Sequence, residues 1–213
     1  MDEEGRSRRQ FFKRGFDKAT KTGLDVLEAR AQHKARHWIR PPFANSELDF
    51  LLACTRCNAC IEACPHQIIF PLPVSRGAEV AATPALDLAN KGCQLCQDWP
   101  CVNACTDNAL GFAFVSVQDG AQDNNDADTQ EALATEEDLL PPKLALLAID
   151  ESACLPYNGP ECGACKGSCP IENALMWKNE KPTINDVTCV GCGLCREACI
   201  VEPKAITITT IRR

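Results

Sequence analysis

The cysteines of this chain fall into four tight groups, and their spacing restricts the possible folds more than any other feature of the sequence. In the first group, CTRCNACIEACP from Cys54 to Pro65, successive cysteines are separated by two, two and three residues. All 16 cysteines belong to such a group of four, which we call a quartet. The quartets are Cys54, Cys57, Cys60 and Cys64; Cys93, Cys96, Cys101 and Cys105; Cys154, Cys162, Cys165 and Cys169; and Cys189, Cys192, Cys195 and Cys199.

This spacing favours iron–sulfur clusters over disulfides and over zinc. Neighbouring cysteines in C-x2-C-x2-C are too close in sequence for a disulfide of normal geometry. Zinc sites typically use paired C-x2-C elements separated by a longer loop, often with histidine, whereas His33, His37 and His66 have no ligand spacing with the cysteines. A [4Fe–4S] cluster takes one thiolate at each of its irons. Four complete quartets therefore predict four [4Fe–4S] clusters.

The ligands of each cluster follow from how far one loop can reach. A tight loop wraps three corners of the cluster, and in bacterial two-cluster ferredoxins the fourth cysteine of each run ligates the other cluster. Links of the same kind separate the first quartet from the second and the third from the fourth, so pairing of these neighbours is the simpler arrangement. The alternative, in which the outer quartets pair and the inner quartets pair, stays open. Local pairing predicts set I (Cys54, Cys57, Cys60, Cys105), set II (Cys93, Cys96, Cys101, Cys64), set III (Cys154, Cys162, Cys165, Cys199) and set IV (Cys189, Cys192, Cys195, Cys169).

The predicted fold class is α+β, with two tandem bacterial-type 2[4Fe–4S] ferredoxin units at residues 46–117 and 143–213. Only 6% of the residues are aromatic and much of the 45% hydrophobic content is thiol, so we expect metal to hold a thin core together. A short apolar segment follows each quartet and predicts a strand that covers a cluster. These segments are IIF at Ile68, ALGFAFVSV at Ala109, ALMW at Ala174 and AITITTI at Ala205, and KLALLAID from Lys143 predicts the first strand of the second unit.

Two segments lie outside the predicted units. Residues 1–45 form a basic leader, predicted to be helical because apolar residues such as Leu27 and Ala31 recur at helical steps; the helix should end at IRPPF, and Ser46 should cap a second one. The leader contains SRRQFFK, which has the look of a twin-arginine export signal but is not followed by an apolar stretch. Residues 118–142 are acidic and predict a solvated linker, with a docking loop for a basic partner as the alternative.

Composition and motifs exclude several functions. The net charge of −7 gives no reason to expect nucleic-acid binding. No apolar run approaches the roughly 18 residues of a membrane-spanning helix. The sequence contains no phosphate-binding loop, no dinucleotide-binding glycine motif and no candidate catalytic triad, so we expect no substrate site of its own. Glycines instead crowd the cluster loops, where they allow close approach of backbone N–H groups to sulfur.

Taken in order, the quartets resemble those of the ferredoxin-type accessory proteins of the periplasmic nitrate reductase and methylamine utilisation systems. The resemblance covers about residues 39–208, and its motifs are RPP with CTRCNACIEACP, then CQLCQDWPCVNAC, CLPYNGPECGACKGSCP and CVGCGLCREACIVEPKAI. It implies electron transfer or maturation around a molybdenum reductase. One branch of this family is exported and passes on electrons from a membrane quinol dehydrogenase, and the other contacts the reductase in the cytoplasm.

Three functions follow as hypotheses. The first is an electron-transfer polyferredoxin whose redox partner is a molybdoenzyme or a quinol dehydrogenase. The second is an iron–sulfur subunit of a larger membrane-associated oxidoreductase, held at the membrane through a partner. The third is a maturation factor for a molybdoenzyme. Because charged residues such as Asp17 and Lys18 interrupt the place of an export signal's apolar stretch, we expect a cytoplasmic protein with an uncleaved N-terminus, with twin-arginine export to the periplasm as the alternative.

Overall fold

The computed structural model describes residue 23 and residues 26–112 and 140–211. Residues 26–34 are helical and continue into the 3₁₀ helix η1 (Ala35–His37), which ends just before the IRPPF segment, as predicted. Leu27 belongs to the predicted apolar stripe, but it is 50% exposed and so lies largely in solvent. The twin-arginine motif, the stripe before residue 23 and the predicted linker up to residue 139 lie outside the described residues.

Residues 38–44, predicted to be part of the leader, belong to the folded body. Trp38 and Arg40 are buried, Ile39 forms a bridge with Leu86, and Ala44 forms a bridge with Leu110. Arg40 binds Glu47 through Nε–Oε2 and Nη2–Oε1 distances of 3.0 and 2.6 Å. Its Nη1 also donates to Thr83 Oγ1 and to the Pro84 carbonyl, each at 2.8 Å. A buried charge needs such a partner and hydrogen bonds, so this pair fixes the start of the fold.

After the N-terminal helix, the described residues of the first half form the short α-helices α2, α3 and α4 and one hairpin. Helix α2 (Glu47–Ala53) begins at Ser46, whose side chain accepts a hydrogen bond from the Asp49 N–H, which confirms the predicted cap. Helices α3 (Ala59–Glu62) and α4 (Pro100–Asn103) each carry a buried cysteine. Strands β1 (Ile69–Pro71) and β2 (Pro84–Leu86) pair antiparallel, with the 3₁₀ helix η2 (Val74–Arg76) between them.

The second half contains two antiparallel strand pairs. Strand β3 (Ala145–Ile149) pairs with β6 (Ile206–Thr210), and β4 (Leu175–Lys178) pairs with β5 (Lys181–Ile184). The 3₁₀ helix η4 (Leu155–Tyr157) follows β3, and helix α5 (Leu194–Glu197) precedes β6. Strands are thus present at four of the five predicted segments. After Ala109 the described residues form only the isolated bridge at Leu110, and the rest of that segment from residue 113 is not described.

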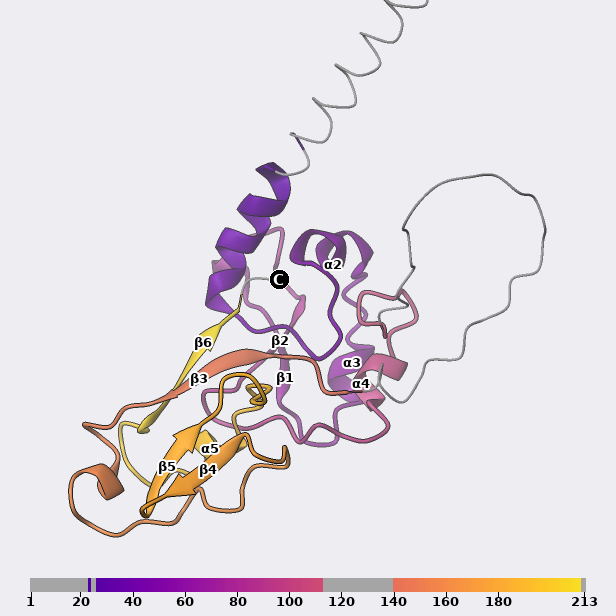
Figure 1. Cartoon of the computed structure of the whole chain (residues 1–213). Coiled ribbons are helices and arrows are strands. Elements are labelled where there is room, and N and C mark those ends of the chain that lie inside the picture. The colour runs from indigo at the N-terminus through magenta and orange to yellow at the C-terminus, as the bar shows by residue number, and fades with distance from the viewer. Residues whose placement is uncertain (1–22, 24–25, 113–139, 212–213) are drawn as a thin grey trace, which may run out of the picture.

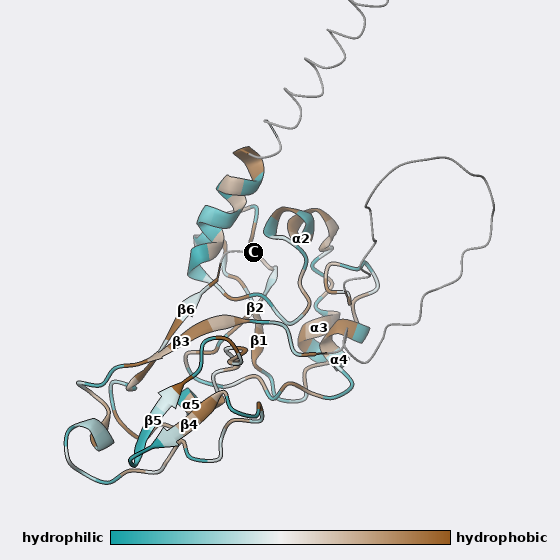
Figure 2. Cartoon of the chain, viewed as in Figure 1, coloured by the Kyte–Doolittle hydropathy of each residue, from teal (hydrophilic) through white to brown (hydrophobic). Residues whose placement is uncertain are grey.

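The two halves share one hydrophobic core. A single cluster of buried side chains includes Phe50 and Leu110 from the first half and Leu144 and Ile206 from the second. Figure 1 shows β3 running beside β6, and the end of β6 reaches the N-terminal helix, where Thr210 Oγ1 donates to the Arg36 carbonyl at 3.0 Å. Figure 2 shows that β3 is hydrophobic along its length. In the described residues no helix is long and apolar enough to cross a membrane.

The contact between the halves includes the cysteine loops themselves. The Cys93 N–H donates to the Cys192 carbonyl at 2.7 Å, and the Gly92 N–H donates to Glu197 Oε2 at 2.8 Å. Arg196 Nε donates in return to the Ala89 carbonyl at 3.1 Å. The two halves are therefore packed against each other through the loops of the second and fourth quartets.

Candidate metal centres

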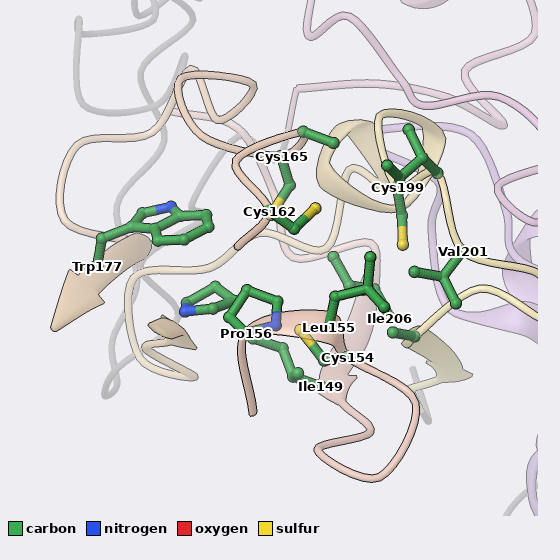
Figure 3. A pocket seen from close by; sticks show the side chains of 14 residues that line it. Ile149, Cys154, Leu155, Pro156, Cys162, Cys165, Trp177, Cys199, Val201 and Ile206 are labelled. Carbon is green, nitrogen blue, oxygen red and sulfur yellow. The ribbon is translucent and has the colours of Figure 1, made fainter. Parts of the chain in front are cut away.

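The structure gathers three of the predicted cysteine sets around separate cavities. These cavities have nearly equal volumes of about 340, 340 and 360 Å³, mouths included, around sets I, II and III respectively. In each case the fourth thiol comes from the neighbouring quartet: Cys105 joins the first, Cys64 joins the second and Cys199 joins the third. Figure 3 shows the four sulfur-bearing side chains of set III pointing into one space from different segments of the chain.

The thiols of set IV also lie close to one another. The pKa of Cys195 is raised by burial and then by the nearby thiols of Cys192, Cys189 and Cys169, along with Cys165 of set III. Burial also raises the pKa of Cys192, and the nearby thiol of Cys169 adds to this shift. The fourth cysteine of the third quartet is therefore near the fourth quartet. Within the described residues, each of the three cavities combines thiols of the first and second quartets or of the third and fourth.

Repeated backbone geometry positions the first cysteine of three loops. Arg56, Leu95 and Gly191 all have positive φ, at 62°, 49° and 74°, and each stands two residues after a first cysteine. Burial raises the pKa of Cys54, Cys93 and Cys189. In each case a hydrogen bond from the backbone N–H of the positive-φ residue two positions later lowers it in part. Left-handed backbone costs about 1–2 kcal/mol at a non-glycine residue, so two of these loops hold a strained conformation that aims an N–H at sulfur.

Gly191 has a second reason to be glycine. A Cβ at this position would lie 2.1 Å from the carbonyl oxygen of Ala145 in β3, which is far inside contact distance. The neighbouring Leu144 N–H donates to the Val190 carbonyl at 2.7 Å. The set IV loop is thus pressed against β3, and only a residue without a side chain fits there.

The protonation of the thiols fits a site for a positively charged metal group. Burial raises the pKa most in six of them, to about 11 in Cys60, Cys165 and Cys192 and to about 12 in Cys93, Cys101 and Cys195. Neighbouring thiols of the same set add to the shift, because several thiolates in one cavity repel one another. Thiols with a raised pKa lose their protons when a metal cation binds to the sulfur in place of the proton. Soft thiolate ligands in groups of four are the donor set of iron–sulfur clusters.

The surroundings of the sets differ in polarity. The set I cavity is bordered by Thr55, Arg56, Asn58 and Asp107, and its Cys57 is exposed. Arg56 is fixed by hydrogen bonds from its guanidinium to the carbonyls of residues 81 and 79, at 3.1 and 2.9 Å. The set III cavity has apolar walls apart from its thiols and one indole nitrogen. The sequence predicted these wall residues to lie in strands or loops, but it did not predict that they line a cavity.

Two features of the site were not predicted from the sequence. The buried Arg40 lies close enough to oppose, together with Arg56, the burial that raises the pKa of Cys54. Trp177 lines the set III cavity from β4. The ALMW segment predicted a strand that covers a cluster, but the letters alone do not indicate where the indole points.

Comparisons with known proteins agree with the cysteine pattern. Residues 53–138 match the family model of a 4Fe–4S dicluster domain. The chain is 33% identical over 181 residues to the methylamine utilization ferredoxin-type protein MauM of Methylobacillus flagellatus, an alignment that covers 80% of this chain and 67% of MauM. The ferredoxin-type protein NapG of Haemophilus influenzae is 31% identical over 223 positions, covering 94% and 71%. NapG of Escherichia coli is 29% identical over 198 residues, covering 87% and 75%. No solved structure matches the chain significantly.

Proposed function

Because the chain belongs to the family of ferredoxin-type proteins that includes NapG and MauM, we propose that it is an electron carrier with four [4Fe–4S] clusters and no substrate site of its own. The coarser part of this statement, a ferredoxin-type 4Fe–4S electron-transfer protein, follows from the family itself. The number of clusters, their ligands and the partner are our proposal. When bound, such clusters supply one-electron redox chemistry.

The convergence of four thiols from two quartets on one cavity supports the ligand assignment. It recurs around three cavities of nearly equal volume, as expected if each holds the same group. We therefore assign sets I, II, III and IV as the ligands of four clusters. The role of the chain is to present these thiolates, to aim backbone N–H groups at them and to exclude water.

The contacts between the sets support a relay function. Cys60 of set I is near enough to Cys101 of set II to raise its pKa, although burial is the main cause. Set II meets set IV through the hydrogen bond from Cys93 to Cys192. Set IV meets set III where Cys165 adds to the raised pKa of Cys195, which is mainly due to burial. The sets thus follow one another in the order I, II, IV, III, and electrons can pass between neighbours without leaving the protein.

Metal analysis and ligand variants test this proposal. Protein prepared without oxygen should be brown and contain about four irons per quartet. Local pairing predicts that Cys105→Ser changes the same EPR signal as Cys57→Ser. If Cys105→Ser instead changes the signal that Cys162→Ser changes, the second and third quartets pair. A colourless protein with one zinc per quartet would refute the iron–sulfur assignment.

The partner we propose is a redox protein such as a molybdoenzyme or a membrane quinol dehydrogenase. Set I is the proposed docking end, because Cys57 is exposed and Leu52 of the adjoining helix α2 is 77% exposed. Leu52→Asp should slow electron exchange with the partner and leave all four cluster signals unchanged. An unchanged exchange rate would place the docking end elsewhere.

For the location we retain the cytoplasm as the proposal, with twin-arginine export as its rival. The charges that follow SRRQFFK are the argument for the cytoplasm. Cell fractionation with N-terminal sequencing decides between the two. A periplasmic form that begins near residue 32 would show that export occurs despite these charges.

A further inference from the structure

The fourth quartet carries an arginine and a glutamate between its third and fourth cysteines, in the run CREAC at residues 195–199. The matching run of the first quartet is CIEAC, and those of the second and third are CVNAC and CKGSC. Only the fourth quartet therefore has a pair of opposite charges at this place. The pair, Arg196 and Glu197, ends helix α5 and lies between a predicted ligand of set IV and one of set III.

Both side chains reach the segment that leads into the second quartet. Glu197 Oε2 accepts a hydrogen bond from the Gly92 N–H at 2.8 Å. The Arg196 guanidinium donates through Nε to the Ala89 carbonyl at 3.1 Å and through Nη1 to the Ile206 carbonyl in β6. Two adjacent residues of α5 thus hold this segment at both of its ends, while Arg196 is also anchored to its own half.

Beside these contacts the two cysteine loops meet through their backbones. The Cys93 N–H donates to the Cys192 carbonyl at 2.7 Å, and a Cβ on Gly92 would lie 2.6 Å from the Leu194 nitrogen. Burial raises the pKa of Cys93 to about 12, and the nearby Cys192 thiol adds to this shift. Cys93 is a predicted ligand of set II and Cys192 of set IV, so one hydrogen bond joins ligands of two different sets.

The side-chain contacts are the stronger part of this junction. Hydrogen bonds with an ionised donor or acceptor are roughly twice as strong as those between neutral groups, and the bonds of Arg196 and Glu197 are of this kind. The bond from Cys93 to Cys192 joins two neutral backbone groups. Glu197 is exposed and Arg196 is half-buried, so either side chain can be shortened without opening a hole in the core.

We propose that Arg196 and Glu197 form a clasp that keeps the loops of the second and fourth quartets in contact, and that electrons pass between the two halves at the hydrogen bond from Cys93 to Cys192. In this step one electron leaves the reduced cluster at one of the two sets and reduces the oxidised cluster at the other, and no covalent bond changes. The inference rests on the proposed function, since it needs clusters at sets II and IV.

Arg196 and Glu197 are positioning residues in this proposal, because neither is a predicted ligand and both act through the segment that carries Cys93. Without the clasp the halves would still share their hydrophobic core. The two loops could then part by local opening, which needs far less free energy than unfolding of the whole chain. Such an opening would interrupt the order I, II, IV, III at its middle step.

Hydrogen exchange tests whether the clasp holds the loop. In Glu197→Ala the Gly92 N–H loses its acceptor, and the neighbouring Cys93 amide should exchange about tenfold faster in the cluster-loaded protein, read by mass spectrometry. Glu197→Gln keeps an oxygen that can accept the same bond, so it should restore most of the protection. Glu62→Ala is the matched control, since Glu62 has the same place in CIEAC. It should leave the exchange of Cys93 unchanged.

Pulsed EPR of the fully reduced protein tests the electron route, because each reduced cluster carries an unpaired spin that interacts with its neighbours. The order I, II, IV, III predicts that clusters II and IV each interact with two neighbours. Glu197→Ala should weaken the interaction between II and IV and leave the interactions within each half as they are. A residue that served stability alone would not change an interaction between clusters that are all present.

The wild-type measurement needs no variant and is decisive by itself. A spectrum made of two separate interacting pairs would overturn the inference and leave the proposed function standing. The inference would equally fail if Glu197→Ala kept the exchange rate of Cys93 or kept the interaction between II and IV. Fewer than four cluster signals in the wild type would refute the proposed function, whereas the exchange of Cys93 would still report on the clasp.

Discussion

Alanine substitutions at three glycines of the cysteine loops separate two physical effects in this fold. Gly163 has ordinary backbone and open space around it, so Gly163→Ala should change stability by less than about 0.5 kcal/mol. Gly167 also has open space, but its φ is +80°, so Gly167→Ala should cost about 1–2 kcal/mol from backbone strain alone. Gly191 has φ of +74° and the Ala145 carbonyl 2.1 Å from the added Cβ.

The Gly191 substitution should therefore be the most damaging of the three. The strain of about 1–2 kcal/mol adds to an overpacking cost of about 1–3 kcal/mol, because the set IV loop or β3 must move. The total is about 2–5 kcal/mol. This movement would also lengthen or break the hydrogen bond from the Leu144 N–H to the Val190 carbonyl.

The assay is the loss of iron–sulfur absorbance in guanidinium without oxygen. Cluster loss makes unfolding irreversible, so the variants are compared by bleaching rate and by midpoint at a fixed time. We expect Gly163→Ala to match the wild type, Gly167→Ala to bleach faster and Gly191→Ala to bleach fastest. If Gly191→Ala behaved like Gly167→Ala, the contact with β3 would contribute nothing and the reasoning would be wrong.

Three further predictions concern charge and metal. Glu47→Ala should destabilise the protein by about 3–5 kcal/mol in the same assay, since it leaves the Arg40 guanidinium buried without its partner. The control is Glu79→Gln, which breaks an exposed ion pair with Lys34 and should cause no measurable change. Arg56→Gln should lower the equilibrium constant for reduction of the set I cluster about threefold, because it removes a nearby positive charge. A redox titration measures this change. Extraction of iron by a chelator should abolish the circular dichroism of the folded protein, and a retained native spectrum would show that the core stands without metal.

The apolar segments beside the quartets were enough to predict four of the strands around the site. Alternating or apolar segments gave β1, β3, β4 and β6 because a strand that packs on a cluster loop needs side chains on a buried face. Ser46 gave the start of α2, since capping is a local interaction. The segment after Ala109 was less regular, and in the described residues it forms one bridge, between Ala44 and Leu110.

Features that depend on distant contacts were not visible in the sequence. The ion pair of Arg40 and Glu47 places two charges in the core, whereas charged residues in a basic leader normally read as exposed. The hydrogen bond from Cys93 to Cys192 joins two backbones and therefore leaves no signal in side-chain type. The orphaned indole of Trp177 likewise depends on a wall assembled from several distant segments of the chain.

The glycines of the cysteine loops show how one residue type serves two purposes in this fold. From the sequence they predicted close approach of the backbone to cluster sulfurs. The structure adds contacts with protein backbone: a Cβ on Gly92 would lie 2.6 Å from the Leu194 nitrogen, and one on Gly191 would meet Ala145. A backbone hydrogen bond of 2.7 Å between Cys93 and Cys192 requires the two loops to approach without intervening side chains. Glycine beside the second loop of each half therefore allows the two halves to pack through their cysteine loops, which brings set II next to set IV.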